Sequence, residues 1–254
     1  MYIKVIACEI FFRELCYCAA HSKNIIDIEF LEQGYHDTPQ VGFKEIQKQI
    51  DLVPANKYDA IVLGYGLCSK ITAGILSHHT KIVIPRVHDC IAIFLGSNQR
   101  YKKMFEEASG TYYYTSGWIE CVERRGGVTN LNGFLLPANA TEGFNAAFSK
   151  LEEKYGKENA QYLISELAAW EKFYSKGVLI NFDFAKHLKL DEKVKEICKN
   201  RGWEYDEIDG NISYLQRLLD GEWNEEDFLV LLPGEKVVPS FDEKVIDKNI
   251  KLID

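Results

Sequence analysis

The chain has 254 residues, 46% of them hydrophobic, and a formal net charge of −8 at pH 7. That length supports one large α/β domain or two smaller lobes, and the acidic balance argues against binding to nucleic acid or to an anionic membrane. No apolar run in the sequence approaches the ~20 residues of a membrane-spanning helix.

Short apolar runs alternate with helical patterns through the first half of the chain. In order, we expect strands at residues 3–7, 25–31, 58–64, 81–85 and 111–115, and helices at residues 9–20, 42–52, 69–77, 91–95 and 99–108. This alternation predicts an α/β fold with a doubly wound, mainly parallel sheet. Right-handed crossovers favour the strand order 2-1-3-4-5 in this N-terminal part.

The second half repeats the alternation after an interruption. Residues 121–142 contain polar turns and several glycines, so we interpret them as a connecting loop. Two amphipathic helices then follow, over residues 144–155 and 163–174, with further strands at residues 177–182, 203–208 and 227–232. We predict an N-terminal lobe of residues 1–120 that carries the functional site and a C-terminal α/β lobe of residues 143–254. A single sheet extended by the second half is the alternative.

The first residues form a strand-like segment without the pattern of a signal peptide, so we expect a cytoplasmic protein. The chain contains seven cysteines, at positions 8, 16, 18, 68, 90, 121 and 198. An odd count in that compartment argues against a disulfide framework. Cys18 and Cys198 fall on the apolar faces of predicted helices, which indicates a structural role for both. The other thiols need a further reason.

Three cysteines come at, or just after, the ends of predicted strands: Cys8, Cys68 and Cys90. In the order 2-1-3-4, these strands are neighbours about 4.8 Å apart, and ligands bind at the carboxyl edge of such sheets. Cys8 and Cys68 also precede predicted helices, whose N-termini favour thiolates. Three thiolates with one open position are typical of a metal that meets a substrate. We therefore predict a metal centre held by these three residues.

The sequence leaves the identity of this metal open between zinc and an iron–sulfur cluster. Zinc draws sulfur ligands to within about 4 Å of one another. Ligands on three successive strands span roughly 10 Å of backbone, which a larger cluster fits with less distortion.

Several charged side chains are expected to complete the site. Arg86 would balance the negative charge of the thiolates or of a substrate. His88 would act as a fourth ligand or as a proton shuttle. Glu9 and Glu120 are the further candidates for a ligand or a catalytic group.

A glycine turn follows the third predicted strand. Gly64 and Gly66 would let the backbone approach a bound group, and together with Ser69 they are candidates for holding a cofactor phosphate. The full dinucleotide fingerprint is missing, because Ser69 stands where the third glycine would be.

Two other classes of function stay open at this point. A metal-free thiol enzyme would use Cys68 or Cys90 as the nucleophile and His88 as the base. A non-catalytic module would instead bind a corrinoid, a nucleotide or a partner protein.

The motifs around these residues resemble a known family. They are Ala7-Cys8-Glu9, Gly64-Tyr-Gly-Leu-Cys68, Ile84-Pro-Arg86 with His88-Asp-Cys90, Leu95-Gly-Ser97, and Thr111-Tyr-Tyr with Gly117-Trp-Ile-Glu120. In this order, they resemble the uncharacterised bacterial and archaeal family called domain of unknown function 1638. The resemblance implies no established catalytic residues. It implies a link to corrinoid-dependent methyl transfer in anaerobes, so a small molecule or a corrinoid protein is the expected partner.

Overall fold

A computed structural model describes residues 1–36, 38–124, 128–131, 134–137, 152–153, 155–168, 173–240 and 242–250. The chain folds as two compact units, of which the first combines Met1–Lys102 with Gly210–Asp254 and the second is Lys103–Asp209. The predicted division at residues 120 and 143 does not coincide with these units. The chain leaves the first unit earlier than expected and returns to it after residue 209.

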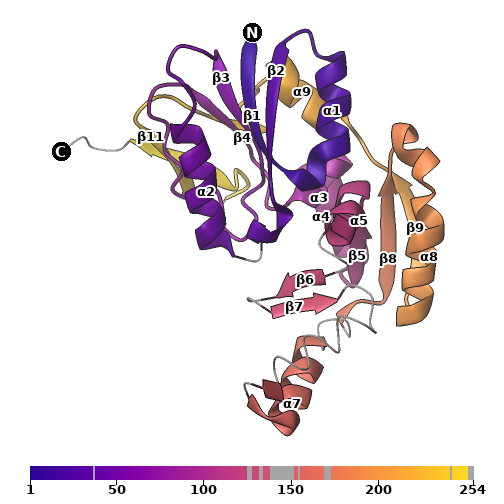
Figure 1. Cartoon of the computed structure of the whole chain (residues 1–254). Helices are drawn as coiled ribbons and strands as arrows, with labels where there is room; N and C mark the ends of the chain where they lie inside the picture. Colours follow the sequence, from indigo (N-terminus) through magenta and orange to yellow (C-terminus); the bar gives the residue numbers. More distant parts are fainter. Residues whose placement is uncertain are drawn as a thin grey trace. The chain divides into compact units, whose positions relative to one another are not determined.

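The first unit contains a five-stranded sheet in the order β10-β4-β3-β1-β2 (Figure 1). Its strands are β1 (Tyr2–Cys8), β2 (Ile25–Leu31), β3 (Ala60–Gly64), β4 (Ile82–Pro85) and β10 (Phe228–Leu231). The first four run parallel, whereas β10 runs antiparallel to β4. The predicted α/β class and the strand order 2-1-3-4 are therefore confirmed.

The fifth predicted strand lies elsewhere. β5 (Thr111–Tyr114) pairs with β8 (Lys176–Asn181) in a parallel sheet of order β5-β8-β9 in the second unit, where β9 is Glu204–Asp209. Its expected place beside β4 is taken by β10. Consecutive strands are neighbours only about two-thirds of the time, so sequence order did not reveal this long-range pairing.

Helices cover the sheet of the first unit. They are α1 (Phe12–His21), α2 (Pro39–Asp51), α3 (Cys90–Leu95) and α9 (Ser213–Asp220), with short 3₁₀ turns at Glu9–Phe11 and Gln33–His36. The helix α4 (Asn98–Glu107) begins in the first unit and ends in the second. Right-handed crossovers that leave β1 and β2 in opposite directions put α1 and α2 on opposite faces. α9 packs against α1 and α3. Cys18 is fully buried on α1, as predicted for a core thiol.

One predicted helix of this unit is absent. Residues 69–77 form turns and a short bridge, because the backbone of this segment pairs with the hairpin β11 (Glu235–Pro239) and β12 (Ile246–Ile250). The N–H of Gly74 donates to the carbonyl of Val237 at 2.9 Å, and the N–H of Val237 donates to the carbonyl of Ile75 at 2.9 Å. The C-terminal hairpin therefore holds the chain that follows β3.

The second unit adds helices to its three-stranded sheet. Its other elements are α5 (Ser116–Arg124), β6 (Val128–Leu131), β7 (Phe134–Pro137), α7 (Lys157–Ala168), the 3₁₀ turn Asp183–Leu188 and α8 (Leu190–Arg201). The predicted connecting loop, residues 121–142, thus includes the end of α5 and an antiparallel pair. Of the helix predicted over residues 144–155, residues 144–151 and 154 lie outside the described residues, and residues 152, 153 and 155 are helical. Cys198 is buried in the core of this unit, as predicted.

Among the described helices, none is both long and apolar enough to cross a membrane.

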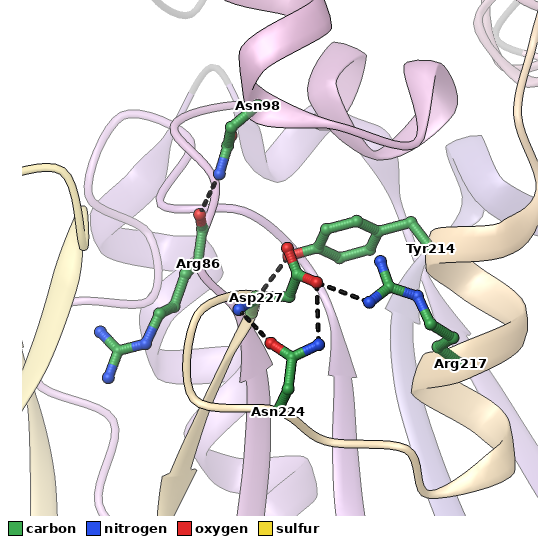
Figure 2. Close-up of polar contacts among 6 residues, drawn as sticks. All are labelled: Arg86, Asn98, Tyr214, Arg217, Asn224 and Asp227. Atoms are coloured by element: carbon green, nitrogen blue, oxygen red, sulfur yellow. Dashed lines mark hydrogen bonds and ion pairs between the residues drawn. The ribbon is translucent and has the colours of Figure 1, made fainter.

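A polar network fastens β10 to its surroundings (Figure 2). The carboxylate of Asp227 accepts from Nη1 of Arg217 at 2.6 Å and from Nδ2 of Asn224 at 3.0 Å. Its backbone carbonyl accepts from the hydroxyl of Tyr214 and from the N–H of Arg86 at 2.8 Å. Asp227 therefore ties α9, the start of β10 and the end of β4 together.

Replacing Asp227 with alanine should lower the free energy of unfolding by about 1–2 kcal/mol, because half-buried Arg217 and exposed Asn224 both lose an acceptor. Urea denaturation measures this loss. Glu226→Ala is the matched control at an exposed neighbour, with an expected change within about 0.5 kcal/mol. Equal losses in the two variants would contradict a bracing role for Asp227.

Candidate functional site

The first unit brings three cysteines to the carboxyl edge of its parallel strands. β1 ends at Cys8, Cys68 lies just beyond the end of β3, and Cys90 begins α3 after β4. Because β1, β3 and β4 are adjacent and parallel, their carboxyl ends lie at the same edge of the sheet (Figure 1).

The glycines after β3 allow this close approach. A Cβ on Gly64 would lie 2.5 Å from Cβ of Ala7, and a Cβ on Gly66 would lie 2.9 Å from Cγ2 of Val87. Contacts that short do not occur between real side chains, so both positions need glycine for packing alone. The predicted phosphate site also depended on the N-terminus of a helix at residue 69, and the structure has turns there instead. Gly64 and Gly66 instead bring the ends of the strands together.

The backbone beyond the strands continues this pairing. The N–H of Leu67 donates to the carbonyl of Val87 at 2.8 Å, and the N–H of Cys68 donates to the carbonyl of His88 at 2.9 Å. The two segments therefore run side by side past the sheet, which carries Cys68 next to Cys90.

The electrostatics of the thiols reflect this proximity. Burial raises the pKa of Cys90 well above its ordinary value, and the charges of Cys68, Asp89 and Cys8 raise it further. The pKa of Cys68 is raised to about 12 by burial and by Asp89, against hydrogen bonds from the backbone of Gly66 and Cys90. Each thiol thus lies within electrostatic reach of another, and Cys90 lies within reach of both.

These shifts run opposite to the activation expected from the sequence. Cys68 does not precede a helix, and burial and like charge outweigh any effect of the short helix that begins at Cys90. Cys68 and Cys90 are therefore neutral thiols at pH 7. A nearby cation, such as a bound metal ion, would favour their thiolate forms.

Asp89 has a structural task beside these thiols. Its carboxylate accepts from the backbone N–H of Ile91 at 2.7 Å and from the hydroxyl of Tyr101 at 2.8 Å. It is the N-cap of α3, which satisfies a donor that the helix leaves open at its start. Asp89 therefore fixes the point at which Cys90 enters the helix.

Sequence reasoning missed a tyrosine at this site. Tyr65 lies between the two glycines and is only 4% exposed. Within the described part of the chain, its hydroxyl has no hydrogen-bond partner. Burial raises the pKa of Tyr65 well above its usual value, and the charges of Cys8 and Cys68 raise it further. The one signal in the sequence was its place between the end of a strand and a candidate ligand.

The other predicted side chains lie at different distances from the thiols. Oε1 of Glu9 accepts from the N–H of Gln33 at 3.0 Å, and the charge of Glu9 is among those that raise the pKa of Tyr65. The side chains of His88 and Ser69 are exposed. Glu9 therefore borders the buried part of the site, whereas His88 is open to solvent.

Two residues predicted for the site, Arg86 and Glu120, lie in other surroundings. Arg86 donates from Nη1 to the carbonyl of Ile246, and to that of Lys244 at 3.4 Å, so its guanidinium contacts the C-terminal hairpin. Figure 2 shows this group directed away from Asp227. In the folded chain, Arg86 therefore contacts this hairpin, and the structure shows no contact of its guanidinium with the thiols that it was predicted to balance. Glu120 lies on α5 in the second unit, and its role at the site stays a prediction.

Among the described residues, no group of three or more His, Cys, Asp or Glu side chains stands ready to hold a metal ion. The three thiols are neighbours rather than a finished ligand set. Metal binding would require their side chains to turn toward a shared centre.

Comparison with known proteins identifies the family. A family model described as protein of unknown function (DUF1638) matches residues 30–219, about three-quarters of the chain. The chain therefore belongs to this family, and the resemblance inferred from its motifs is confirmed. The matched stretch includes Cys68 and Cys90 and begins after Cys8. Neither a curated protein nor a solved structure matches the chain.

The turn that carries Cys68 is strained. Cys68, Ser69 and Lys70 all adopt left-handed backbone conformations, with φ of 35°, 54° and 68°. Each such residue other than glycine costs about 1–2 kcal/mol. Three in succession persist because the β11 hairpin and the pairing with residues 87–88 hold the chain on both sides.

Substitutions at Ser69 test this strain without touching a thiol. Ser69→Gly removes the left-handed penalty, whereas Ser69→Val adds a β-branched side chain in the same conformation. We expect the glycine variant to be more stable than the valine variant by about 2 kcal/mol in urea denaturation. Equal stability of the two would show that this turn is relaxed in solution.

Proposed function

We propose that this member of the DUF1638 family binds a metal ion or an iron–sulfur cluster through Cys8, Cys68 and Cys90. The observation that carries the proposal is the placement of three cysteines at the carboxyl ends of three adjacent parallel strands, with the backbone of Cys68 paired to the segment that leads into Cys90. Thiolates are the preferred ligands of zinc and of iron–sulfur clusters in proteins.

The chemistry of these donors supports the proposal. Neighbouring half-buried thiols repel one another once they are deprotonated, so the raised pKa values of Cys68 and Cys90 favour neutral thiols in the free chain. A divalent cation removes that repulsion. Three thiols and one divalent ion then give a complex of three thiolates, and three protons pass to the solvent. Tyr65, with its unpartnered buried hydroxyl, lies next to the same thiols.

Zinc and an iron–sulfur cluster remain the two candidates. Ligands that come from three adjacent strands favour the larger cluster. When bound, zinc would supply Lewis-acid or thiolate-activating chemistry, and a cluster would supply electron transfer. Exposed His88 would meet an incoming small molecule or corrinoid protein, as a fourth ligand or as a proton carrier.

The metal-free thiol enzyme has less support. A cysteine nucleophile needs a lowered pKa or an adjacent base, whereas burial raises the pKa of both Cys68 and Cys90. A binding module without a metal would not explain why three cysteines meet at one edge of the sheet. We therefore place the metal centre first and treat the other two functions as outcomes of its test.

Metal analysis after purification without oxygen tests the proposal directly. We expect near-stoichiometric zinc, or iron with acid-labile sulfide, in the wild-type chain. Cys68→Ser should lower that content severalfold, because it removes one of three ligands. Cys16→Ser is the control, since Cys16 is an exposed thiol on α1. Metal content that is unchanged in Cys68→Ser would refute the assignment.

The pH dependence of zinc affinity gives an independent check. Raised thiol pKa values mean that each ligating cysteine releases a proton on binding, so affinity should increase with pH. Between about pH 6 and 8, we expect a slope of about two to three decades of affinity per pH unit, measured by competition with a chelating dye. In Cys68→Ser the slope should fall by about one. A flat profile would mean that thiols are not the ligands.

A further inference from the structure

Tyr65 presents a buried polar group that the ligand set of three cysteines does not use. Its side chain is 4% exposed, and its hydroxyl makes no hydrogen bond to the part of the chain that the structure describes. A buried hydroxyl without a partner lowers stability, and phenylalanine at the same place would avoid that penalty. The hydroxyl therefore suits a state of the protein in which it does find an acceptor.

The surroundings of Tyr65 indicate which acceptor that is. Ala7 of β1 pairs with Gly64 of β3, so Cys8 and Tyr65 occupy the next positions on the two neighbouring chain segments. Burial is the main cause of the raised pKa of Tyr65, and among the neighbouring charges that of Cys8 comes first, followed by Cys68, Tyr35 and Glu9. Thiols are weak acceptors, but thiolates are strong ones. The acceptor next to the hydroxyl thus becomes effective when the cysteines lose their protons.

The negative charge of the proposed metal site would favour a hydrogen-bond donor such as the hydroxyl of Tyr65. Three thiolates and the carboxylate of Glu9 carry four negative charges, of which a divalent ion balances two. The guanidinium of Arg86 donates to carbonyls of the C-terminal hairpin. Hydrogen bonds to ligating sulfurs stabilise such centres and set their properties.

We propose that the hydroxyl of Tyr65 donates a hydrogen bond to the thiolate of Cys8 when a metal is bound and thereby stabilises the bound state. This inference rests on the proposed metal centre. Tyr65 is in this sense a positioning residue: it acts on a ligand rather than on the metal.

A pair of tyrosine-to-phenylalanine variants separates this role from a structural one. In Tyr65→Phe, we expect zinc affinity to fall roughly ten- to a hundredfold, with unchanged stoichiometry. The urea midpoint of its metal-free form should be equal to that of the wild type or higher, because an unpaired hydroxyl is removed. Tyr214→Phe is the matched control, since the hydroxyl of Tyr214 is buried and bonded to the carbonyl of Asp227. It should lose stability without metal and keep its zinc affinity.

The outcomes distinguish the role of Tyr65 from the metal centre itself. Equal zinc affinity of Tyr65→Phe and wild type would overturn the inference and leave the metal centre intact. A clear loss of stability in metal-free Tyr65→Phe would overturn it too, because the hydroxyl would then have a partner in the free chain. Failure of the wild type to bind zinc or iron would overturn the metal centre and, with it, the role of Tyr65.

Two further backgrounds identify the acceptor. The effect of Tyr65→Phe on zinc affinity should disappear in Cys8→Ser and persist in Cys68→Ser. The reverse pattern would overturn the assignment to Cys8.

Discussion

The close approach of β3 to both of its neighbours is the constraint on which the site depends. At Gly64 the neighbour is Ala7 on β1, and at Gly66 it is Val87 beyond β4, in both cases at distances that exclude any side chain. The three chain segments could not otherwise run side by side past the sheet. A cysteine follows each of these contacts within a few residues, so the tight packing of the backbone brings the three cysteines close together.

That cluster has an electrostatic consequence. Cys68 and Cys90 are half-buried beside the buried phenol of Tyr65 and a carboxylate, and none of these groups favours a negative charge on its neighbours. Without a cation, the folded chain therefore disfavours thiolates. The same arrangement makes proton release and cation binding a single event, so affinity for a metal is coupled to pH. Burial raises the pKa of Cys68 and Cys90, which argues against a thiol nucleophile and is compatible with thiols that ionise only when a metal binds.

The sequence predicted the features that local patterns determine. Apolar runs located β1, β3 and β4, and hence the edge at which Cys8, Cys68 and Cys90 meet. It did not predict β10 beside β4 or the loss of the helix at residues 69–77, because both follow from pairing with distant segments. The direction of Arg86 and the isolation of the Tyr65 hydroxyl are likewise set by tertiary packing, which no local spacing encodes.

The return of the chain to the first unit after residue 209 explains how a strained turn survives at the site. β11 pairs with residues 74–77 just after the left-handed turn, and Asp227 holds the end of β4 through the N–H of Arg86. Both contacts act within a few residues of a cysteine, at Cys68 and at Cys90. Asp227 and the hairpin strand β11 thus brace the two thiols that lie outside the regular strands, whereas Cys8 is held by β1 itself. A site assembled in this way depends on both segments of the first unit, including the one that begins at Gly210.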